Sequence, residues 1–340
     1  MDKIGFGVIG AGLLGDLHAQ VYHRLPGAEL VAVADINGER ARTVAGKYDA
    51  QPYTDYVELL KHPDIQAVSI VTPDFAHRDP AVAAAQAGKH ILCEKPLATT
   101  VAEAEEIVAA AKQANVKLMV AFANRISPPF AAAKEKILAG QLGQPAYGYI
   151  RLSNTLFVPH EMLSWAGKSS ALWFLGSHTV DMMRFLLDDE PARVYAASRA
   201  NILKSQGVDT NDFHVAILEF NKGAVFTTEN AWILPRSQPM VYDFKMELVG
   251  SEGAVYVDTS HHRGLELHTE GSLAYGDILG VLPTGKNRVG GFAMETIAQF
   301  VDALLYDEPL LATGEDGLAV TRILTAIEES AKTGQPVDLA

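Results

Sequence analysis

The amino-acid sequence predicts an α/β protein with a doubly wound parallel sheet in its N-terminal part and a large open, mostly antiparallel sheet in its C-terminal part. Three observations lead to this prediction. Strand-like and helix-like segments alternate through about the first 120 residues. A glycine-spaced turn joins the first of these strands to the first helix. After residue 145 the character changes, and strand-like segments follow one another closely.

In the first predicted domain, residues 1–122, apolar β-prone runs alternate with runs whose apolar residues recur at helical spacing. The expected strands are 4–9, 30–34, 65–71, 90–93 and 118–121, and the expected helices are 13–25, 81–87 and 101–114. Such alternation implies βαβ units, whose right-handed crossovers produce a parallel sheet.

The second predicted domain, residues 123–340, begins with a helix expected at 131–139. Glycine or polar turns separate several of the strand-like runs that follow, which is typical of an antiparallel sheet. These runs are 146–152, 193–197, 213–220, 224–231, 242–249, 254–257 and 265–268. Helices are expected at 172–187, 292–305 and 315–332, and residues 271–287 are expected to form a long surface loop or lid.

The turn after the first strand has the pattern G-x-G-x-x-G, formed by Gly10, Gly12 and Gly15. The first glycine permits a tight turn, the second lets a pyrophosphate approach the backbone, and the third lets helix and strand pack closely. Leu13 and Leu14 begin the helix, whose free N–H groups and positive dipole end favour a phosphate. This context predicts a Rossmann nicotinamide-dinucleotide site; a tight turn without a ligand is the alternative.

Asp35 ends the second strand, about 20 residues after the last glycine, where a ribose would be held. Its carboxylate can accept hydrogen bonds from both adenosine ribose hydroxyls and would repel a 2′-phosphate, so NAD is favoured over NADP. Arg40 and Arg42 on the next helix are expected on a solvated face, although either could turn toward a phosphate.

Composition narrows the class of protein. The 340 residues have a net charge of −13, which argues against binding to nucleic acid or to an anionic membrane surface. The single cysteine, Cys93, excludes an internal disulfide and fits a reducing compartment. The sequence shows no signal peptide and no apolar run long enough to span a membrane, so a cytoplasmic location is expected.

Several further motifs resemble those of the Gfo/Idh/MocA oxidoreductase family, named after glucose–fructose oxidoreductase and inositol dehydrogenase, and the resemblance spans nearly the whole chain. They are Thr72-Pro73-Asp74-Phe75-Ala76-His77, Glu94-Lys95-Pro96, Asn124-Arg125, Gly176-Ser177-His178-Thr179-Val180-Asp181 and Asp316-Gly317. The resemblance implies an NAD-dependent enzyme in which the lysine of the Glu-Lys-Pro motif contacts the substrate hydroxyl, and in which a cis peptide often precedes the proline.

Positions in the predicted fold agree with that resemblance. Ligands of open α/β sheets bind beyond the carboxyl ends of the strands, and both Thr72-Pro73 and Lys95 follow such ends. We therefore expect Lys95 at the nicotinamide end of the site, with Glu94 orienting it or bonding to the cofactor. The expected cofactor-binding set is Gly10, Gly12, Leu13, Leu14, Asp35, Thr72, Pro73, His77, Glu94, Lys95 and Asn124.

His178 is the second expected catalytic residue, because an imidazole can take the alcohol proton as hydride leaves the same carbon. Lys95 would stabilise the developing alkoxide. Asp181, one turn along the same helix, is expected to cap, to pair with a neighbour or to orient the histidine. Many members of the family carry an aspartate where this chain has Phe174. Either Phe174 or Trp173 stacks on a sugar face, or another group replaces the carboxylate, or both rings are simply core.

The expected substrate contacts combine polar groups with an aromatic ring, which suits a carbohydrate. They are Lys95, Arg125, Asn154, His160, Trp165, Phe174 and His178, with Asn124 beside them. The pair His261-His262 lacks further ligands at metal-binding spacing, so no metal is expected.

The sequence thus predicts an NAD-dependent dehydrogenase acting on a secondary alcohol of a sugar, cyclitol or sugar derivative, and a homodimer or homotetramer paired through its open sheet. Three alternatives remain. Tightly bound NAD could serve redox-assisted glycoside cleavage or epimerisation; the chain could be a non-catalytic ligand sensor; or it could reduce imines or non-sugar carbonyls, which the same fold accepts.

Overall fold

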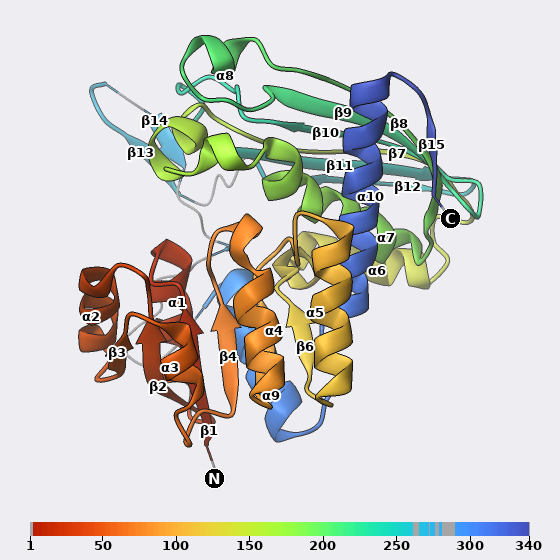
Figure 1. The fold of residues 1–340 in the computed structure, drawn as a ribbon. Helices are drawn as coiled ribbons and strands as arrows, with labels where there is room; N and C mark the ends of the chain where they lie inside the picture. Colours follow the sequence, from red (N-terminus) through yellow and green to blue (C-terminus); the bar gives the residue numbers. More distant parts are fainter. Residues whose placement is uncertain (1–2, 261–264, 272, 276–278, 281–289, 340) are drawn as a thin grey trace. The chain divides into compact units, whose positions relative to one another are not determined.

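The structure, a computed structural model, describes residues 3–260, 265–271, 273–275, 279–280 and 290–339. The chain divides into two compact units. The first comprises residues 1–123 and 279–321, and the second comprises residues 124–278 and 322–340. Figure 1 labels most of the α-helices and strands of both units.

The first unit is built on a parallel sheet, as the sequence predicted, and the sheet has six strands where five were expected. In spatial order these are β3 (Gln51–Tyr53), β2 (Ala28–Ala34), β1 (Ile4–Ile9), β4 (Ala67–Ile70), β5 (His90–Cys93) and β6 (Leu118–Val120). Its helices are α1 (Leu13–Arg24), α2 (Gly38–Lys47), α3 (Tyr56–Leu60), α4 (Arg78–Gln86), α5 (Val101–Gln113), α9 (Phe292–Leu305) and the 3-10 helix η1 (Asp74–Ala76). The short elements β3 and α3 were not predicted, because each is too brief to show a clear period.

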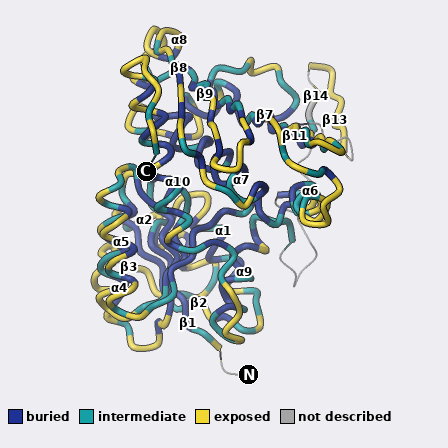
Figure 2. Tube along the Cα trace, turned by 90° about the vertical axis from the view of Figure 1, so that its right-hand side faces the viewer, coloured by how far each residue is buried: buried dark blue, intermediate teal, exposed yellow. Residues whose placement is uncertain are grey.

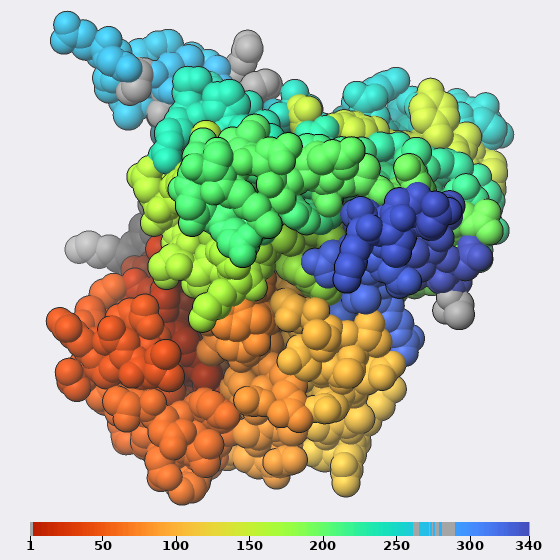
Figure 3. All heavy atoms as spheres, turned by 45° about the horizontal axis from the view of Figure 1, so that its top comes forward, coloured from red at the N-terminus to blue at the C-terminus, as the bar shows by residue number. Residues whose placement is uncertain are grey.

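Helices cover both faces of this sheet. Residues of α1, α2 and α9 join β1 and β2 in one apolar core that includes Phe6, Tyr22 and Phe300. The rings of Phe6 and Tyr22 stack with centroids 4.0 Å apart. On the other face α3, α4 and α5 follow one another, and the outer surfaces of α4 and α5 lie side by side in Figure 3. In Figure 2 the strands of this unit are buried, and its helices are exposed on their outer sides.

The sequence analysis placed the domain boundary between residues 122 and 123 and assigned everything after it to the second domain. The observed first unit also contains residues 279–321. The physical reason is α9, whose residues Met294, Ile297 and Phe300 are at most 2% exposed in the core shared with β1 and α1. Helix α10 (Gly314–Thr333) begins in the first unit and enters the second at Arg322.

The second unit contains a mixed sheet of seven strands. Their spatial order is β12 (Ala254–Asp258), β11 (Tyr242–Gly250), β7 (Pro145–Asn154), β10 (Val225–Ala231), β9 (Phe213–Phe220), β8 (Pro191–Arg199) and β15 (Val337–Asp338). Every neighbouring pair is antiparallel except β10 with β7. The predicted strand at 265–268 lies outside this sheet: among the described residues, β13 (Glu266–His268) pairs with β14 (Leu273–Tyr275) in a separate two-stranded antiparallel sheet.

One face of the seven-stranded sheet packs against helices, among them α7 (Ser177–Leu187). The remaining helical segments of this unit are η2 (Ala123–Ile126), α6 (Pro128–Leu138), η3 (Val158–Met162), η4 (Ala166–Lys168), η5 (Leu172–Gly176) and α8 (Ile202–Ser205). On the opposite face, alternate residues of the strands are exposed, including Tyr147, Tyr195, Ile217 and Tyr256.

The predicted helix 172–187 is in fact two elements, the π-helix η5 followed by α7. Gly176 lies at their junction, where an added Cβ would be 2.8 Å from Leu172 and 3.1 Å from Asn230. π-Turns often occur at functional sites. The predicted loop 271–287 lies largely outside the described residues, and its described part includes β14. In the part of the chain that the structure describes, no helix is long and apolar enough to span a membrane.

Candidate active site

The glycine turn provides open space at one position and close packing at the others. Gly10 has φ +107°, and a Cβ there would lie 2.5 Å from the Val71 carbonyl oxygen. A Cβ on Gly15 would lie 1.9 Å from the Gly10 carbonyl oxygen. A Cβ on Gly12, in contrast, would meet no atom of the described residues within 4 Å. The fold of the turn therefore requires Gly10 and Gly15, whereas Gly12 leaves a free approach to the backbone.

The first turn of α1 completes this phosphate-binding geometry. Within the described part of the chain no side chain caps the helix at Gly12, so its first N–H groups keep their capacity to bind a phosphate. Leu13 and Leu14 begin the helix and are 74% and 42% exposed. An open, uncapped helix start beside a small residue is the environment that a pyrophosphate needs, so these residues fit the expected dinucleotide.

Asp35 ties the end of β2 to the glycine turn. Its Oδ2 accepts the N–H of Ala11 at 2.8 Å, and its Oδ1 accepts the N–H of Asn37 at 2.7 Å. The Arg40 guanidinium lies 2.9 Å from Oδ1 and so is paired rather than simply solvated. Because a carboxylate offers about four acceptor positions, Asp35 retains capacity for a ribose hydroxyl.

The loops after β4 and β5 are joined by a buried histidine. His77, 1% exposed, places Nδ1 at 2.7 Å from the Pro96 carbonyl oxygen and Nε2 at 3.0 Å from the Thr72 carbonyl oxygen. The hydroxyl of Thr72 donates to the Ala76 carbonyl, and the peptide between Lys95 and Pro96 is cis. His77 thus holds together the two strand ends at which Thr72, Pro73 and Lys95 were expected.

Lys95 lies directly after β5, half-buried, in a site with two neighbouring carboxylates. Burial lowers the pKa of its ammonium, while the charges of Glu94 and Asp74 act in the opposite direction. Burial also acts to raise the pKa of Glu94, but a hydrogen bond from His18 and the nearby positive charges outweigh it and leave that pKa below its usual value. A half-buried lysine with a perturbed pKa at a strand end is a candidate for chemistry.

His178 is the second residue of α7, and a side chain from the segment before α6 holds its ring. Asn124 Nδ2 lies 3.0 Å from His178 Nδ1. With the amide nitrogen as the donor, Nδ1 accepts and the neutral ring carries its proton on Nε2; a 180° rotation of the amide would present Oδ1 and reverse this assignment. Asn124, expected among the cofactor contacts, is thus found beside the expected catalytic histidine.

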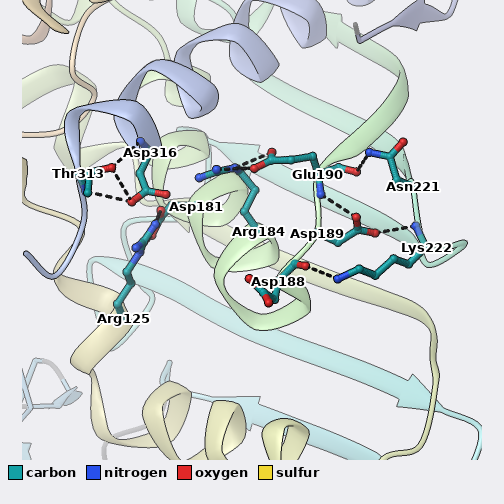
Figure 4. A network of polar contacts seen from close by, with 10 residues as sticks. All are labelled: Arg125, Asp181, Arg184, Asp188, Asp189, Glu190, Asn221, Lys222, Thr313 and Asp316. Carbon is teal, nitrogen blue, oxygen red and sulfur yellow. Dashed lines mark hydrogen bonds and ion pairs between the residues drawn. The ribbon is translucent and has the colours of Figure 1, made fainter. Parts of the chain in front are cut away.

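Arg125 and Asp181 form a buried ion pair (Figure 4). The guanidinium donates to both carboxylate oxygens, with Nη2 at 2.6 Å from Oδ1 and Nε at 3.0 Å from Oδ2. The two side chains are 9% and 1% exposed. Of the three roles considered for Asp181, pairing with a neighbour is the one observed. Arg125, expected among the substrate contacts, here anchors the segment that carries Asn124.

Aromatic rings surround the position where the family aspartate is absent. The Phe174 ring is 6.1 Å from the Trp165 ring and 5.9 Å from the Trp232 ring, measured between centroids. Trp173 is 6% exposed and donates through Nε1 to Glu328, so it belongs to the core. The structure therefore brings together Trp165 and Phe174, two of the expected substrate contacts.

The other two expected substrate contacts in this unit are Asn154 and His160. Asn154 ends β7 and is 5% exposed; its Nδ2 donates to the Val241 carbonyl, while its Oδ1 is buried without a hydrogen-bond partner among the described residues. His160, in η3, contacts Gln206 through Nε2 at 2.7 Å. His261 and His262 lie outside the described residues, and within the described ones no cluster of three or more potential ligands could hold a metal ion.

Two residues of the candidate site were not identified from the sequence. One is Trp232, fully buried against Phe174, with an indole N–H that has no partner among the described residues. The other is His18, which contacts Glu94 from α1. A polar residue on the buried face of α1 was the signal for His18, whereas nothing local to Trp232 distinguishes it from an ordinary core residue.

Comparison with known proteins decides the family. Residues 4–122 match the oxidoreductase family with an NAD-binding Rossmann fold, and residues 130–256 match the GFO/IDH/MocA C-terminal domain. The chain is 30% identical over 338 residues to the scyllo-inositol 2-dehydrogenase (NAD(+)) of Bacillus subtilis (strain 168). The alignment covers 98% of this chain and 95% of that protein. The chain belongs to the Gfo/Idh/MocA oxidoreductase family.

Other Gfo/Idh/MocA-like proteins extend this finding. The myo-inositol 2-dehydrogenase of Thermotoga maritima is 27% identical, with 98% of each chain covered. The structure of an oxidoreductase domain protein from Kribbella flavida matches with a TM-score of 0.85 and 27% identity over 100% of both chains. The structure of scyllo-inositol dehydrogenase from Lactobacillus casei, with bound NAD(H) and scyllo-inositol, matches with a TM-score of 0.84 and covers 99% of each chain. Because the two sequences are only 18% identical, this match shows the common fold. The family, the fold class and NAD as cofactor, all predicted from the sequence, are confirmed.

Proposed function

We propose that this Gfo/Idh/MocA oxidoreductase transfers hydride reversibly between NAD and a secondary alcohol of a cyclitol, sugar or sugar derivative. The observation that carries the proposal is the half-buried Lys95 at the carboxyl end of β5, flanked by the Glu94 and Asp74 carboxylates, in the unit that contains the open glycine turn. The substrate class is supported by relatives named as inositol dehydrogenases.

In this mechanism Lys95 binds and polarises the substrate hydroxyl. The neighbouring carboxylates favour the ammonium form against the effect of burial. An ammonium held in a partly desolvated place stabilises negative charge as it develops on the oxygen. The NAD that Gly10, Gly12 and Asp35 would hold would supply the hydride acceptor for the carbon that carries this oxygen.

His178 is proposed to take the hydroxyl proton at Nε2 during oxidation and to return it during reduction. To accept a proton at Nε2, the neutral ring must carry its hydrogen on Nδ1, which then donates to Asn124 Oδ1. We therefore propose that Asn124 selects the ring tautomer and fixes the ring plane. In this respect Asn124 substitutes for the aspartate that many family members carry at the position of Phe174.

The remaining expected contacts are proposed to bind the two ligands in different ways. Asn154, His160, Trp165 and Phe174 supply amide, imidazole and aromatic surface suited to a polyol. Arg125 acts indirectly, because its guanidinium holds Asp181. On the cofactor side, Gly10, Gly12, Leu13, Leu14, Asp35, Thr72, Pro73 and Glu94 stay as proposed, and His77 contributes by joining the loops. Asp35 favours NAD over NADP.

A substrate screen tests this function. Cyclitols, sugars and glycosides are supplied with NAD or NADP, and formation of the reduced cofactor is followed by absorbance. The expected result is NAD-dependent oxidation of at least one polyol. Lys95→Met should abolish turnover but leave NAD binding intact. Product formation without net NADH would instead favour tightly bound NAD and redox-assisted cleavage or epimerisation, and no turnover of any compound would favour a ligand sensor.

We also propose that the exposed face of the seven-stranded sheet pairs subunits. Tyr147, Tyr195, Ile217 and Tyr256 are 44–69% exposed on this face, and exposed apolar groups on one surface are typical of an interface. Sedimentation velocity should show a dimer or tetramer, and Ile217→Glu should dissociate it. A wild-type monomer would contradict the proposal.

A further inference from the structure

A chain of polar side chains runs through the core of the first unit and ends at the Glu-Lys-Pro motif. The Tyr22 hydroxyl lies 2.6 Å from Ser69 Oγ, which lies 2.9 Å from His18 Nδ1. His18 Nε2 lies 3.2 Å from Glu94 Oε1. Tyr22 and Ser69 are fully buried, and the His18 and Glu94 side chains are 2% and 14% exposed. Three elements, α1, β4 and the end of β5, therefore meet through this chain.

The hydrogen bonds of the chain have a defined direction. The ionised Glu94 carboxylate can only accept, so His18 Nε2 donates to it. In the neutral ring Nδ1 then accepts, so the Ser69 hydroxyl donates to Nδ1 and the Tyr22 hydroxyl donates to Ser69. Burial raises the pKa of Tyr22, so its phenol stays a donor. All three donors thus point toward the carboxylate, and each polar group in the chain is satisfied.

Packing alone does not account for this chain. Its polar groups lie in an apolar core where Ala19 and Val21, on the same helix, are fully buried. Buried polar groups cost free energy unless all their hydrogen bonds are made, and apolar residues of similar size would fill the same space without that requirement. A satisfied network that ends on one particular carboxylate indicates that the position of this carboxylate matters.

That carboxylate belongs to the residue before the proposed catalytic lysine, and its charge acts on the lysine ammonium. Glu94 Oε2 lies 3.3 Å from the backbone N of Lys95. The titratable groups that favour the ionised form of Glu94 are His18, Lys95 and His77, and the carboxylates that favour the Lys95 ammonium are Glu94 and Asp74. Any change that moves or neutralises Glu94 therefore removes one of the two negative charges that favour the Lys95 ammonium.

We propose that His18 is a positioning residue for hydride transfer: supported by Ser69 and Tyr22, it holds the Glu94 carboxylate ionised and in place beside Lys95. The inference rests on the proposed function only in naming hydride transfer as the affected step. Its structural content, that His18 acts on the Lys95 ammonium through Glu94, is testable without turnover.

The test compares variants of two histidines on the same helix. His18→Leu removes the bond to Glu94, and His18→Gln restores an amide donor. His23→Leu is the matched control, because His23 lies on α1 but is exposed. In each full-length protein, lysines are reductively methylated with ¹³C-formaldehyde, and the titration of Lys95 is followed by NMR and assigned with Lys95→Met. The pH profile of kcat and the affinity for NAD are measured in parallel.

In His18→Leu we expect the Lys95 titration and the alkaline limit of kcat to move to lower pH, because the ammonium loses the favourable charge of Glu94. A displaced catalytic group typically lowers the rate on the order of 10- to 100-fold, so kcat should fall by that amount. His18→Gln should recover part of both effects, and His23→Leu should show neither.

Identical Lys95 titrations in His18→Leu and His23→Leu would overturn the inference even if the wild type oxidises polyols. A wild type without polyol oxidation, together with a shifted Lys95 titration in His18→Leu, would overturn the proposed function but not the role of His18. If His18→Leu does not fold, Tyr22→Phe, which keeps the ring stacked on Phe6, provides the same comparison with a smaller expected shift, and no shift in that variant would overturn the inference.

Discussion

Replacing Asn124 with aspartate should raise the pKa of His178 and keep the hydrogen of its neutral ring on Nδ1. In the wild type, Asn124 Nδ2 lies 3.0 Å from His178 Nδ1. A carboxylate at this position can only accept, so it would fix the hydrogen on Nδ1 and leave Nε2 as the basic nitrogen. The variant therefore separates the role of Asn124 as a tautomer selector from a simple steric role.

The size of the effect follows from the geometry. A carboxylate oxygen in place of Nδ2 would put the two charge centres about 4 Å apart, which corresponds to about 4 kcal/mol at an effective dielectric constant near 20. At about 1.4 kcal/mol per pKa unit, this is an upper limit of about three units. Because His178 is only half-buried, solvent screening reduces the expected rise in its pKa to about one to two units.

The direction in which the pH limits of activity move follows from the protonation state of His178. A raised pKa keeps the ring protonated to higher pH, and a protonated ring cannot take the alcohol proton. The acid limit of alcohol oxidation in Asn124→Asp should therefore move to higher pH, while ketone reduction near neutral pH should be retained. Asn124→Leu, which lacks both charge and hydrogen bond, should slow both directions without moving the limit upward.

The assay is ¹⁵N NMR of histidine-labelled protein, in which the two neutral tautomers and the imidazolium have distinct shifts. The expected result for Asn124→Asp is an Nδ1–H tautomer and a higher titration midpoint for His178 than in the wild type. An unchanged titration midpoint, or a neutral ring with its hydrogen on Nε2, in a folded variant would refute the reasoning. Because NMR does not require turnover, this outcome is independent of the proposed substrate.

Three further predictions concern the two units separately. Gly12→Ala should leave thermal stability unchanged but weaken NAD binding in a calorimetric titration, whereas Gly15→Ala should destabilise the fold, because its Cβ would lie 1.9 Å from a carbonyl oxygen. Asp181→Leu leaves the Arg125 guanidinium, which is 9% exposed, without its carboxylate partner, so urea unfolding should show that the free energy of unfolding falls by about 3–5 kcal/mol. A fall of less than about 1 kcal/mol would contradict a buried pair. Asp35→Ser should lower kcat/KM for NAD about 10- to 100-fold, since hydrogen bonds to a charged group contribute about 1.5–3 kcal/mol each, and should permit NADP. Adding Arg40→Leu should then remove NADP use, because Arg40 is the cation beside Asp35.

The sequence by itself determined the fold class, because local signals agree with the global structure. The alternation of short apolar runs and helical periods, the glycines before α1 and the acid after β2 each act over a few residues, and each appears where expected. Motif residues such as Lys95 were also placed correctly at strand ends, because a parallel sheet collects all its carboxyl ends on one edge.

Only the tertiary structure decided which distant residues meet. The Asn124–His178 contact, the Arg125–Asp181 pair and the His18–Glu94 bond join residues 54, 56 and 76 positions apart. No local period encodes such contacts, since they depend on how separately formed elements pack. For the same reason α9 could be recognised as a helix from its sequence, but its place in the core of the first unit could not.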